Sequence, residues 1–139
     1  MKLLAVDTAA HLCAACIYDS RLRQVSGRAI EDIGRGHAEK LIAVIEKALE
    51  LSDLDYESVD RLCVCVGPGS FTGIRVGVAA MRGMALSLDI PLIGVTALEA
   101  LAADVEGERA VLAMLAARRG EVYAQLFVSG SEPSDARAM

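Results

Sequence analysis

CVCVGPGSFTGIRVGVAAMRGMAL, residues 63–86, joins an apolar strand-like run to a long helix-like run through a glycine-rich turn. When such a turn follows a parallel strand and opens a helix, the free backbone N–H groups and the helix dipole favour an anion there. The glycine spacing is G-x-G-x-x-x-G, which matches neither the dinucleotide-binding fingerprint nor the P-loop. Two functions remain open for this stretch: it cradles a phosphate, or its helix is covered by another protein.

The phosphate interpretation gives a role to a few polar groups around the turn. Arg75 would neutralise the phosphate, and the hydroxyls of Ser70 and Thr72 would donate hydrogen bonds to it. In the competing interpretation Ser70 only caps the helix, and the glycines only allow a tight turn. The candidate site for weakly bound ATP or ADP, with no tightly bound cofactor, consists of Asp7, Gly67, Gly69, Ser70, Thr72, Gly73 and Arg75.

The helix behind the turn carries the second interpretation. Between Ile74 and Leu86 its charged residues are Arg75 and Arg82, and a helix that is apolar all round is covered on more than one side. Each interior glycine costs about 1 kcal/mol relative to alanine, which close backbone approach must offset. We expect this helix and the helix near residues 41–51 to form a protein interface, with the candidate residues Leu41, Ile45, Gly73, Gly77, Ala80, Met81 and Met84.

The order of apolar runs predicts an α/β protein. Three strand-like runs joined by short turns indicate an antiparallel meander, and later runs alternate between helix and strand periodicity. The fourth and fifth strands are linked through a helix, so they should be parallel with a right-handed crossover. The expected strands are KLLAVDT, LCAACIYD, QVSGRAIE, RLCVCV and PLIGV, and the expected helices are HAEKLIAVIEKALEL, residues 71–88 and ALEALAAD.

The domain organisation follows from where this pattern stops. Residues 1–106 are expected to form one lobe. Residues 107–128 contain two apolar runs around the turn RRGE, which predict a hairpin that begins a second, shortened lobe. Residues 129–139 are polar and are expected to lack regular structure.

Composition limits the classes of function. The 139 residues carry a formal charge of −5 with scattered basic side chains, which argues against a free-standing nucleic-acid binder, so tRNA would be contacted only through a partner. The N-terminal MKLLAVDTAA is interrupted by Asp7 and so lacks the apolar core of a signal peptide. No apolar stretch reaches the length of a membrane span. These features predict a soluble cytoplasmic protein without membrane contact.

Four cysteines raise the question of a zinc site. Cys13 and Cys16 form a C-x-x-C pair, and Cys63 and Cys65 form a C-x-C pair. Both pairs lie within apolar runs typical of strand interiors, where a free cysteine behaves as a small buried hydrophobe. We therefore predict no bound metal. The two histidines, His11 and His37, are expected at a turn and at a helix start.

Several of these stretches together resemble the TsaB (YeaZ) family of the bacterial tRNA threonylcarbamoyladenosine (t6A) machinery. They are LLAVDTAAHLCAACIYD, GHAEKLIAVIEKAL, VGPGSFTGIRVGVAAMRGMALSLDIPLIGVTALEALA and ARRGEVYAQLF, and the resemblance covers about residues 1–128. It implies a ribonuclease H-like, actin-like lobe with a mixed five-stranded sheet of order 3-2-1-4-5 and helices on both faces. The chain departs from the family in its length and in Ala116, where an acidic residue is frequent.

The resemblance also implies a function. In the related transferase TsaD an H-x-x-x-H pair after the fifth strand holds a catalytic metal, and Ala97 and Leu101 stand at those positions here. A non-catalytic scaffold is therefore expected, which dimerises with TsaD through its first two helices and helps recruit the ATPase TsaE. When isolated, it is expected to form a homodimer. The alternative is an enzyme of the Gcp family: a nucleotide hydrolase using Asp7, or a metallopeptidase-like hydrolase.

Overall fold

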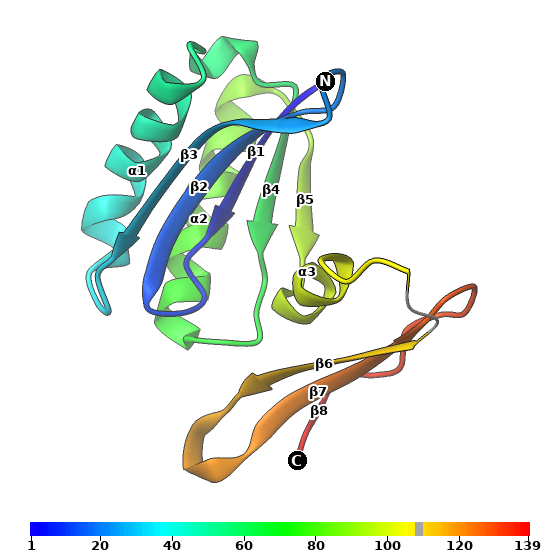
Figure 1. Ribbon diagram of the computed structural model, residues 1–139. Coiled ribbons are helices and arrows are strands. Elements are labelled where there is room, and N and C mark those ends of the chain that lie inside the picture. Colours follow the sequence, from blue (N-terminus) through cyan, green and yellow to red (C-terminus); the bar gives the residue numbers. More distant parts are fainter. Residues whose placement is uncertain (108–109) are drawn as a thin grey trace.

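Two β-sheets make up the architecture, and residues 1–107 and 110–139 are described by the computed structural model (Figure 1). The first sheet contains β1 (Lys2–Asp7), β2 (Leu12–Asp19), β3 (Gln24–Asp32), β4 (Arg61–Cys65) and β5 (Leu92–Val95). Its strand order is β3-β2-β1-β4-β5. The second sheet contains β6 (Ala110–Ala116), β7 (Val122–Val128) and β8 (Arg137–Ala138). Residues 108–109, part of the hairpin region expected at 107–128, lie outside the described residues.

The pairing within the first sheet confirms the expected topology. β1 pairs antiparallel with β2, and β2 pairs antiparallel with β3, which forms the meander. β1 and β4 are parallel, as are β4 and β5. Between β4 and β5 the chain runs through the 18-residue helix α2 (Phe71–Leu88), as the crossover requires.

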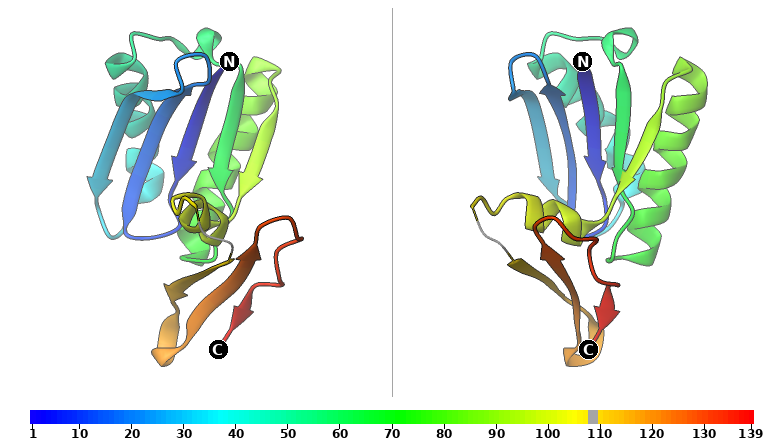
Figure 2. Two further views of the ribbon diagram at one scale, coloured as in Figure 1. Left: turned by 45° about the vertical axis from the view of Figure 1, so that its right-hand side comes forward. Right: turned by 90° about the vertical axis from the view of Figure 1, so that its right-hand side faces the viewer.

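Helices α1 (His37–Leu51) and α2 lie together on one face of this sheet, whereas the seven-residue α3 (Ala97–Ala103) lies at the carboxyl end of the strands on the other side (Figure 2). Helices therefore lie on both sides of the sheet, as expected, although among the described residues the second face carries only the short α3 at its carboxyl end. The core lies between the sheet and the two long helices. Its fully buried large side chains include Leu4, Ile17, Leu41, Ile45, Leu62 and Met81.

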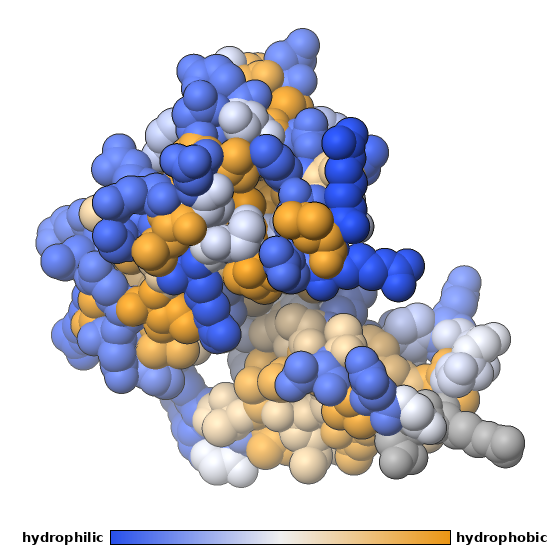
Figure 3. Space-filling model, turned by 45° about the horizontal axis from the view of Figure 1, so that its top comes forward, coloured by the Kyte–Doolittle hydropathy of each residue, from blue (hydrophilic) through white to orange (hydrophobic). Residues whose placement is uncertain are grey.

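The second sheet is small and partly uncovered. β6 and β7 pair antiparallel over seven residue pairs around a turn at Arg118–Gly120, where RRGE was expected to turn the chain. The tail differs from its expectation, because Arg137 and Ala138 form β8 by pairing with β7. Hydrophobic residues reach the surface over this sheet (Figure 3). The exposed ones are Leu112, Met114, Leu126 and Val128.

The remaining regular element is a short 3-10 helix at Tyr56–Ser58, between α1 and β4. Within the described part of the chain, no helix has both the length and the apolar character that crossing a bilayer demands.

Candidate functional site: the glycine-rich turn and the cleft beneath it

The glycine-rich turn is fixed to the end of β1 by backbone and side-chain hydrogen bonds. Ser70 caps α2, because its hydroxyl accepts a hydrogen bond from the Gly73 N–H at 3.2 Å, and its own N–H donates to the Ala9 carbonyl at 2.6 Å. The Asp7 carboxylate accepts from the Ala9 N–H at 2.8 Å. Gly67 has φ of +95°, a left-handed conformation that glycine adopts without strain. The turn is therefore held by the β1–β2 loop.

A cleft of about 800 Å³ opens where this turn, α3 and the second sheet meet. Asp7, Gly69 and Ser70 line it from the first lobe. The wall formed by α3 contributes Ala97 and Leu101 among others. The hairpin contributes the polar side chains Arg118, Glu121 and Tyr123, and the remaining charged or ionisable lining residues are His11 and Asp104.

The structure brings only part of the predicted phosphate site together. Gly67 and Gly73 are buried behind the turn, and neither lines the cleft. Thr72 and Arg75 are exposed elsewhere on α2, so the hydroxyl and the positive charge expected to face a phosphate are directed away from it. The Arg75 guanidinium instead lies 3.7 Å from the centre of the Phe71 ring. The site as predicted therefore lacks its cation.

Sequence reasoning missed the residues that form the opposite wall of the cleft. Arg118, Glu121 and Tyr123 belong to the stretch ARRGEVY, which was used only as a motif and a turn signal. Their position beneath the glycine-rich turn depends on how the second sheet meets the first, and no local periodicity encodes that arrangement. His11 was placed correctly at a turn, where its Nε2 lies 3.9 Å from an Asp32 carboxylate oxygen.

The predicted interface is also corrected by the packing of α2. Gly73 and Gly77 are buried, and a Cβ on either would collide with Thr8, at its carbonyl and its hydroxyl respectively. Close approach therefore occurs within the chain, to the residue that directly follows β1. Five of the predicted interface residues are buried inside the protein, and Ala80 and Met84 are half-buried against the same core. The five buried ones are Leu41, Ile45, Gly73, Gly77 and Met81.

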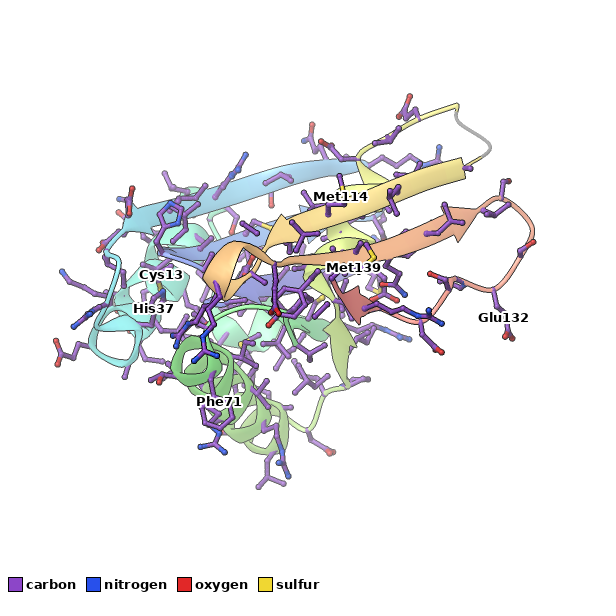
Figure 4. All side chains as sticks on the ribbon, turned by 90° about the horizontal axis from the view of Figure 1, so that it is seen from below. Cys13, His37, Phe71, Met114, Glu132 and Met139 are labelled. Atoms are coloured by element: carbon purple, nitrogen blue, oxygen red, sulfur yellow. The ribbon has the colours of Figure 1, made fainter. Side chains whose placement is uncertain are left out.

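The opposite side of α2 is open, and we call it the outer stripe: Phe71, Arg75, Ala79, Arg82, Gly83 and Leu86. Phe71 is 67% exposed and Leu86 is 86% exposed. Figure 4 shows Phe71 on the outer side of the helix, away from the sheets. A Cβ on Gly83 would meet no atom of residues 1–107 or 110–139 within 4 Å. The outer stripe is thus the α2 surface available to a partner.

The cysteines lie in strands, as predicted, but on two different faces. Cys13 is fully buried toward the helices, whereas Cys16, Cys63 and Cys65 are half-buried on the other face. Burial raises the pKa of the Cys65 thiol from 9.0 to about 11, with a smaller contribution from nearby Asp7. Within residues 1–107 and 110–139, no three His, Cys, Asp or Glu side chains form a cluster that could hold a metal ion.

His37 has a structural position at the start of α1. It is 7% exposed, and its Nε2 lies 3.1 Å from the Leu12 carbonyl of β2. In Figure 4 its side chain lies beside that of Cys13, where α1 meets the sheet. This contact joins α1 to β2, and His37 does not line the cleft.

Comparison with known proteins places the chain among t6A-related sequences. Residues 18–138 match the family model described as TsaD, tRNA N6-adenosine threonylcarbamoyltransferase. The tRNA threonylcarbamoyladenosine biosynthesis protein TsaB of Escherichia coli K12 is 32% identical over 126 residues, which covers 88% of this chain and 53% of that protein. The TsaB of Haemophilus influenzae is 33% identical over 139 residues, covering 97% of this chain and 57% of that protein.

A solved structure shows the same fold. YeaZ from Pseudomonas aeruginosa superimposes with a TM-score of 0.80 at 28% identity, over 99% of this chain and 64% of that chain. By the coverages given for the two TsaB proteins, the chain spans little more than half the length of these curated relatives. The sheet order and this likeness confirm the predicted ribonuclease H-like, actin-like lobe and the resemblance to TsaB (YeaZ) proteins. The chain belongs to the family described as TsaD, tRNA N6-adenosine threonylcarbamoyltransferase.

Proposed function

We propose that this protein is a non-catalytic partner subunit of the cytoplasmic machinery that makes t6A in tRNA. In this proposal it binds a TsaD transferase, helps recruit the ATPase TsaE, and contacts tRNA only through the complex. The names of the TsaB relatives support a role in t6A biosynthesis. The net charge of −5 is consistent with tRNA contact through a partner.

The observation that carries the non-catalytic role is the pair Ala97 and Leu101 on α3. Both side chains line the cleft, one helical turn apart, and Leu101 is 45% exposed. They stand at the positions where the resemblance expects the metal-binding histidines of a transferase. An aliphatic side chain offers no lone pair to a metal, so this wall of the cleft would not hold the catalytic ion.

The outer stripe is the surface we assign to the partner. Gly73 and Gly77 are explained by their approach to Thr8, but Gly83 makes no such approach to any described residue. An interior glycine costs about 1 kcal/mol relative to alanine. Gly83 and Ala79 together would let a partner helix approach α2 closely, with the two helix axes at the short end of the usual 8–10 Å separation. The exposed Phe71 and Leu86 would supply the apolar area.

Complex formation with TsaD tests this assignment. We expect the purified chain and the TsaD of the same organism to form a complex by size-exclusion chromatography with light scattering. Gly83→Glu should abolish the complex, because it places a bulky charge in the contact, while the circular dichroism spectrum stays unchanged. Without TsaD, the same stripe should form a homodimer with the same sensitivity. Ala103→Glu, which places the same charge at an exposed position on α3, is the matched control and should bind normally.

If Gly83→Glu still bound TsaD as the parent does, the outer stripe would not be the contact surface. If the parent chain did not bind TsaD at all, the partner-subunit proposal itself would fail.

A nucleotide hydrolase is the second candidate, and the cleft beside Asp7 is the observation that favours it. Its lining contains three carboxylates, those of Asp7, Asp104 and Glu121, and two basic side chains, those of Arg118 and His11. A triphosphate would meet more acidic than basic groups there, because Arg75 is directed elsewhere. We therefore expect weak ATP or ADP binding without turnover, and we assign no peptidase activity.

A further inference from the structure

The outer edge of the second sheet is formed by a segment that is held through the backbone. Residues 134–139, which include β8 and which we call the tail strand, run antiparallel along β7 (Figure 2). Val122 and Met139 exchange two backbone hydrogen bonds, of 2.8 and 2.9 Å, and the Ser134 N–H donates to the Leu126 carbonyl at 3.0 Å. Every residue of the tail strand is exposed. Because it buries no residue, the tail strand can leave β7 with little loss of apolar contact.

Release of the tail strand would leave β7 with an open edge. Strand alternation directs the backbone N–H and C=O groups of Val122, Ala124 and Leu126 toward the tail strand, whereas those of the residues between them face β6. The seven residues of β7 carry no charge and include neither proline nor glycine. An edge of this kind is a template for pairing with another strand.

The sequence of β7 is nearly symmetric about Gln125. Valine stands at both ends, an aromatic residue follows inside each valine, and an aliphatic residue stands on each side of the glutamine: VYAQLFV, residues 122–128. Two identical strands that pair antiparallel about a two-fold axis place equivalent positions opposite each other across the centre. Pairing centred on Gln125 would set Tyr123 opposite Phe127 of a second copy, and Val122 opposite its Val128. Aromatic pairs across neighbouring strands stabilise such a pairing.

The side chain of Gln125 is an independent sign that this edge fits a further partner. Its Nε2 donates a 2.8 Å hydrogen bond to the Ser134 carbonyl of the tail strand. Its Oε1 is buried and accepts no hydrogen bond from any described residue, which costs free energy. In the pairing centred on Gln125, the two glutamines form a non-hydrogen-bonded pair with Cα atoms about 4.5 Å apart. The Nε2 released from Ser134 would then donate to the Oε1 of the other copy.

We propose that the edge of β7 binds β7 of a second copy, antiparallel and centred on Gln125, and that the tail strand blocks this pairing. The tail strand and the second copy compete for the same backbone groups of β7. The tail strand therefore sets the concentration at which two copies join. This surface is separate from the outer stripe, so the proposal does not rest on the assigned t6A function.

Two proline substitutions in the full chain test the blocking role. By strand alternation the Arg137 N–H faces Ala124 of β7, whereas the Ala138 N–H faces away from β7. Arg137→Pro should release the tail strand, and Ala138→Pro is the matched control. Both changes are made together with Gly83→Glu, which removes dimerisation through the outer stripe. In sedimentation velocity, we expect the Arg137→Pro chain to dimerise at a concentration at least about tenfold lower than the Ala138→Pro chain.

A disulfide between copies tests the register. Gln125→Cys should form a link between two copies under mild oxidation, because a non-hydrogen-bonded pair brings the Cα atoms within disulfide range. Adding Arg137→Pro should make the link form faster. Leu126→Cys is the matched control: Leu126 would lie opposite Ala124 of the second copy, so the two Leu126 positions are diagonal, about 7–8 Å apart, and should not link. Peptide mapping by mass spectrometry identifies which cysteines are joined.

A further variant tests the centre of the pairing. Gln125→Glu, added to the Arg137→Pro chain, places two carboxylates opposite each other and should abolish the dimer while the circular dichroism spectrum stays unchanged. Dimerisation of the Arg137→Pro chain no stronger than that of the Ala138→Pro chain would overturn the proposal. So would a dimer that survives Gln125→Glu, the absence of a link through Gln125→Cys, or a link that forms as readily through Leu126→Cys.

Discussion

The hydroxyl of Thr8, which is fully buried, donates a 2.7 Å hydrogen bond to the carbonyl of Gly73 in the first turn of α2. The bond ties the end of β1 to the start of the helix at the floor of the glycine-rich turn. Gly77, one turn further along, has no side chain and so leaves room for the same hydroxyl. The first two glycines of α2 therefore serve the packing of this chain on itself.

Gly77→Ala should lower the free energy of unfolding by about 1–3 kcal/mol, the usual cost of overpacking. The added methyl would collide with the Thr8 hydroxyl and lie 3.5 Å from Val64 Cγ2. Urea denaturation followed by circular dichroism measures the change. Gly83→Ala is the matched control, and because it lies in open space it should raise stability by up to about 1 kcal/mol.

Thr8→Ala combined with Gly77→Ala should recover part of the loss, since the two side chains compete for one space. A Gly77→Ala variant as stable as the parent would contradict this account of α2. The larger changes Gly77→Leu and Ala80→Arg, at two of the residues first expected in the interface, should unfold the monomer, because both positions pack inside the protein.

Alkylation of Cys65 should be slow in the native protein. Its pKa is raised from 9.0 to about 11 by burial, so the neutral thiol is favoured in the folded state. At pH 9 an ordinary thiol is about half ionised, whereas one with the raised pKa is about 1% ionised, and only the thiolate reacts. Mass spectrometry after iodoacetamide treatment should show about fiftyfold slower labelling than in the urea-unfolded chain.

The rate should rise toward the unfolded value as the pH passes through about 11. The same linkage makes the folded state lose stability as the pH rises from 9.0 toward that value, because the unfolded thiol ionises first. Native Cys65 that reacts at pH 9 as fast as the unfolded chain would show that burial does not protect the thiol.

ATP should bind weakly and should not be hydrolysed. Arg118 and His11 are outnumbered by carboxylates in the cleft, and Arg75 stacks on Phe71 instead of facing it. Isothermal titration with Mg-ATP, together with a phosphate-release assay, checks both statements. Submicromolar affinity that is lost on Asp7→Asn, or turnover above the buffer rate, would favour the hydrolase.

Local sequence patterns were sufficient to predict the elements of the first lobe. The apolar residues repeat at intervals typical of strands up to Asp32 and of helices at 71–88, and α2 has those bounds. Patterns could not decide which side of α2 faces the sheet, because small residues occur on both sides. Only the position of Thr8 shows that Gly73 and Gly77 are internal whereas Gly83 is external.

Two other features depend on contacts that are distant in sequence. The strand β8 forms because Arg137 and Ala138 reach the edge of β7, and their polar surroundings give no strand signal. The cleft brings Arg118 and Tyr123 within one cavity with Asp7, more than a hundred residues earlier. The sequence shows the motif around Arg118, but it does not show which residues lie across the cleft from that motif.

Formation of t6A on unmodified tRNA tests the central claim most directly. Purified TsaD of the same organism is supplied with threonylcarbamoyl-AMP and tRNA, with TsaE and ATP present, and the modified nucleoside is quantified by mass spectrometry. We predict that the chain alone produces none, that adding it to TsaD raises the yield, and that Gly83→Glu removes this increase while Ala103→Glu does not. Modification by the chain alone, or a yield that is the same with and without it, would contradict the partner-subunit account.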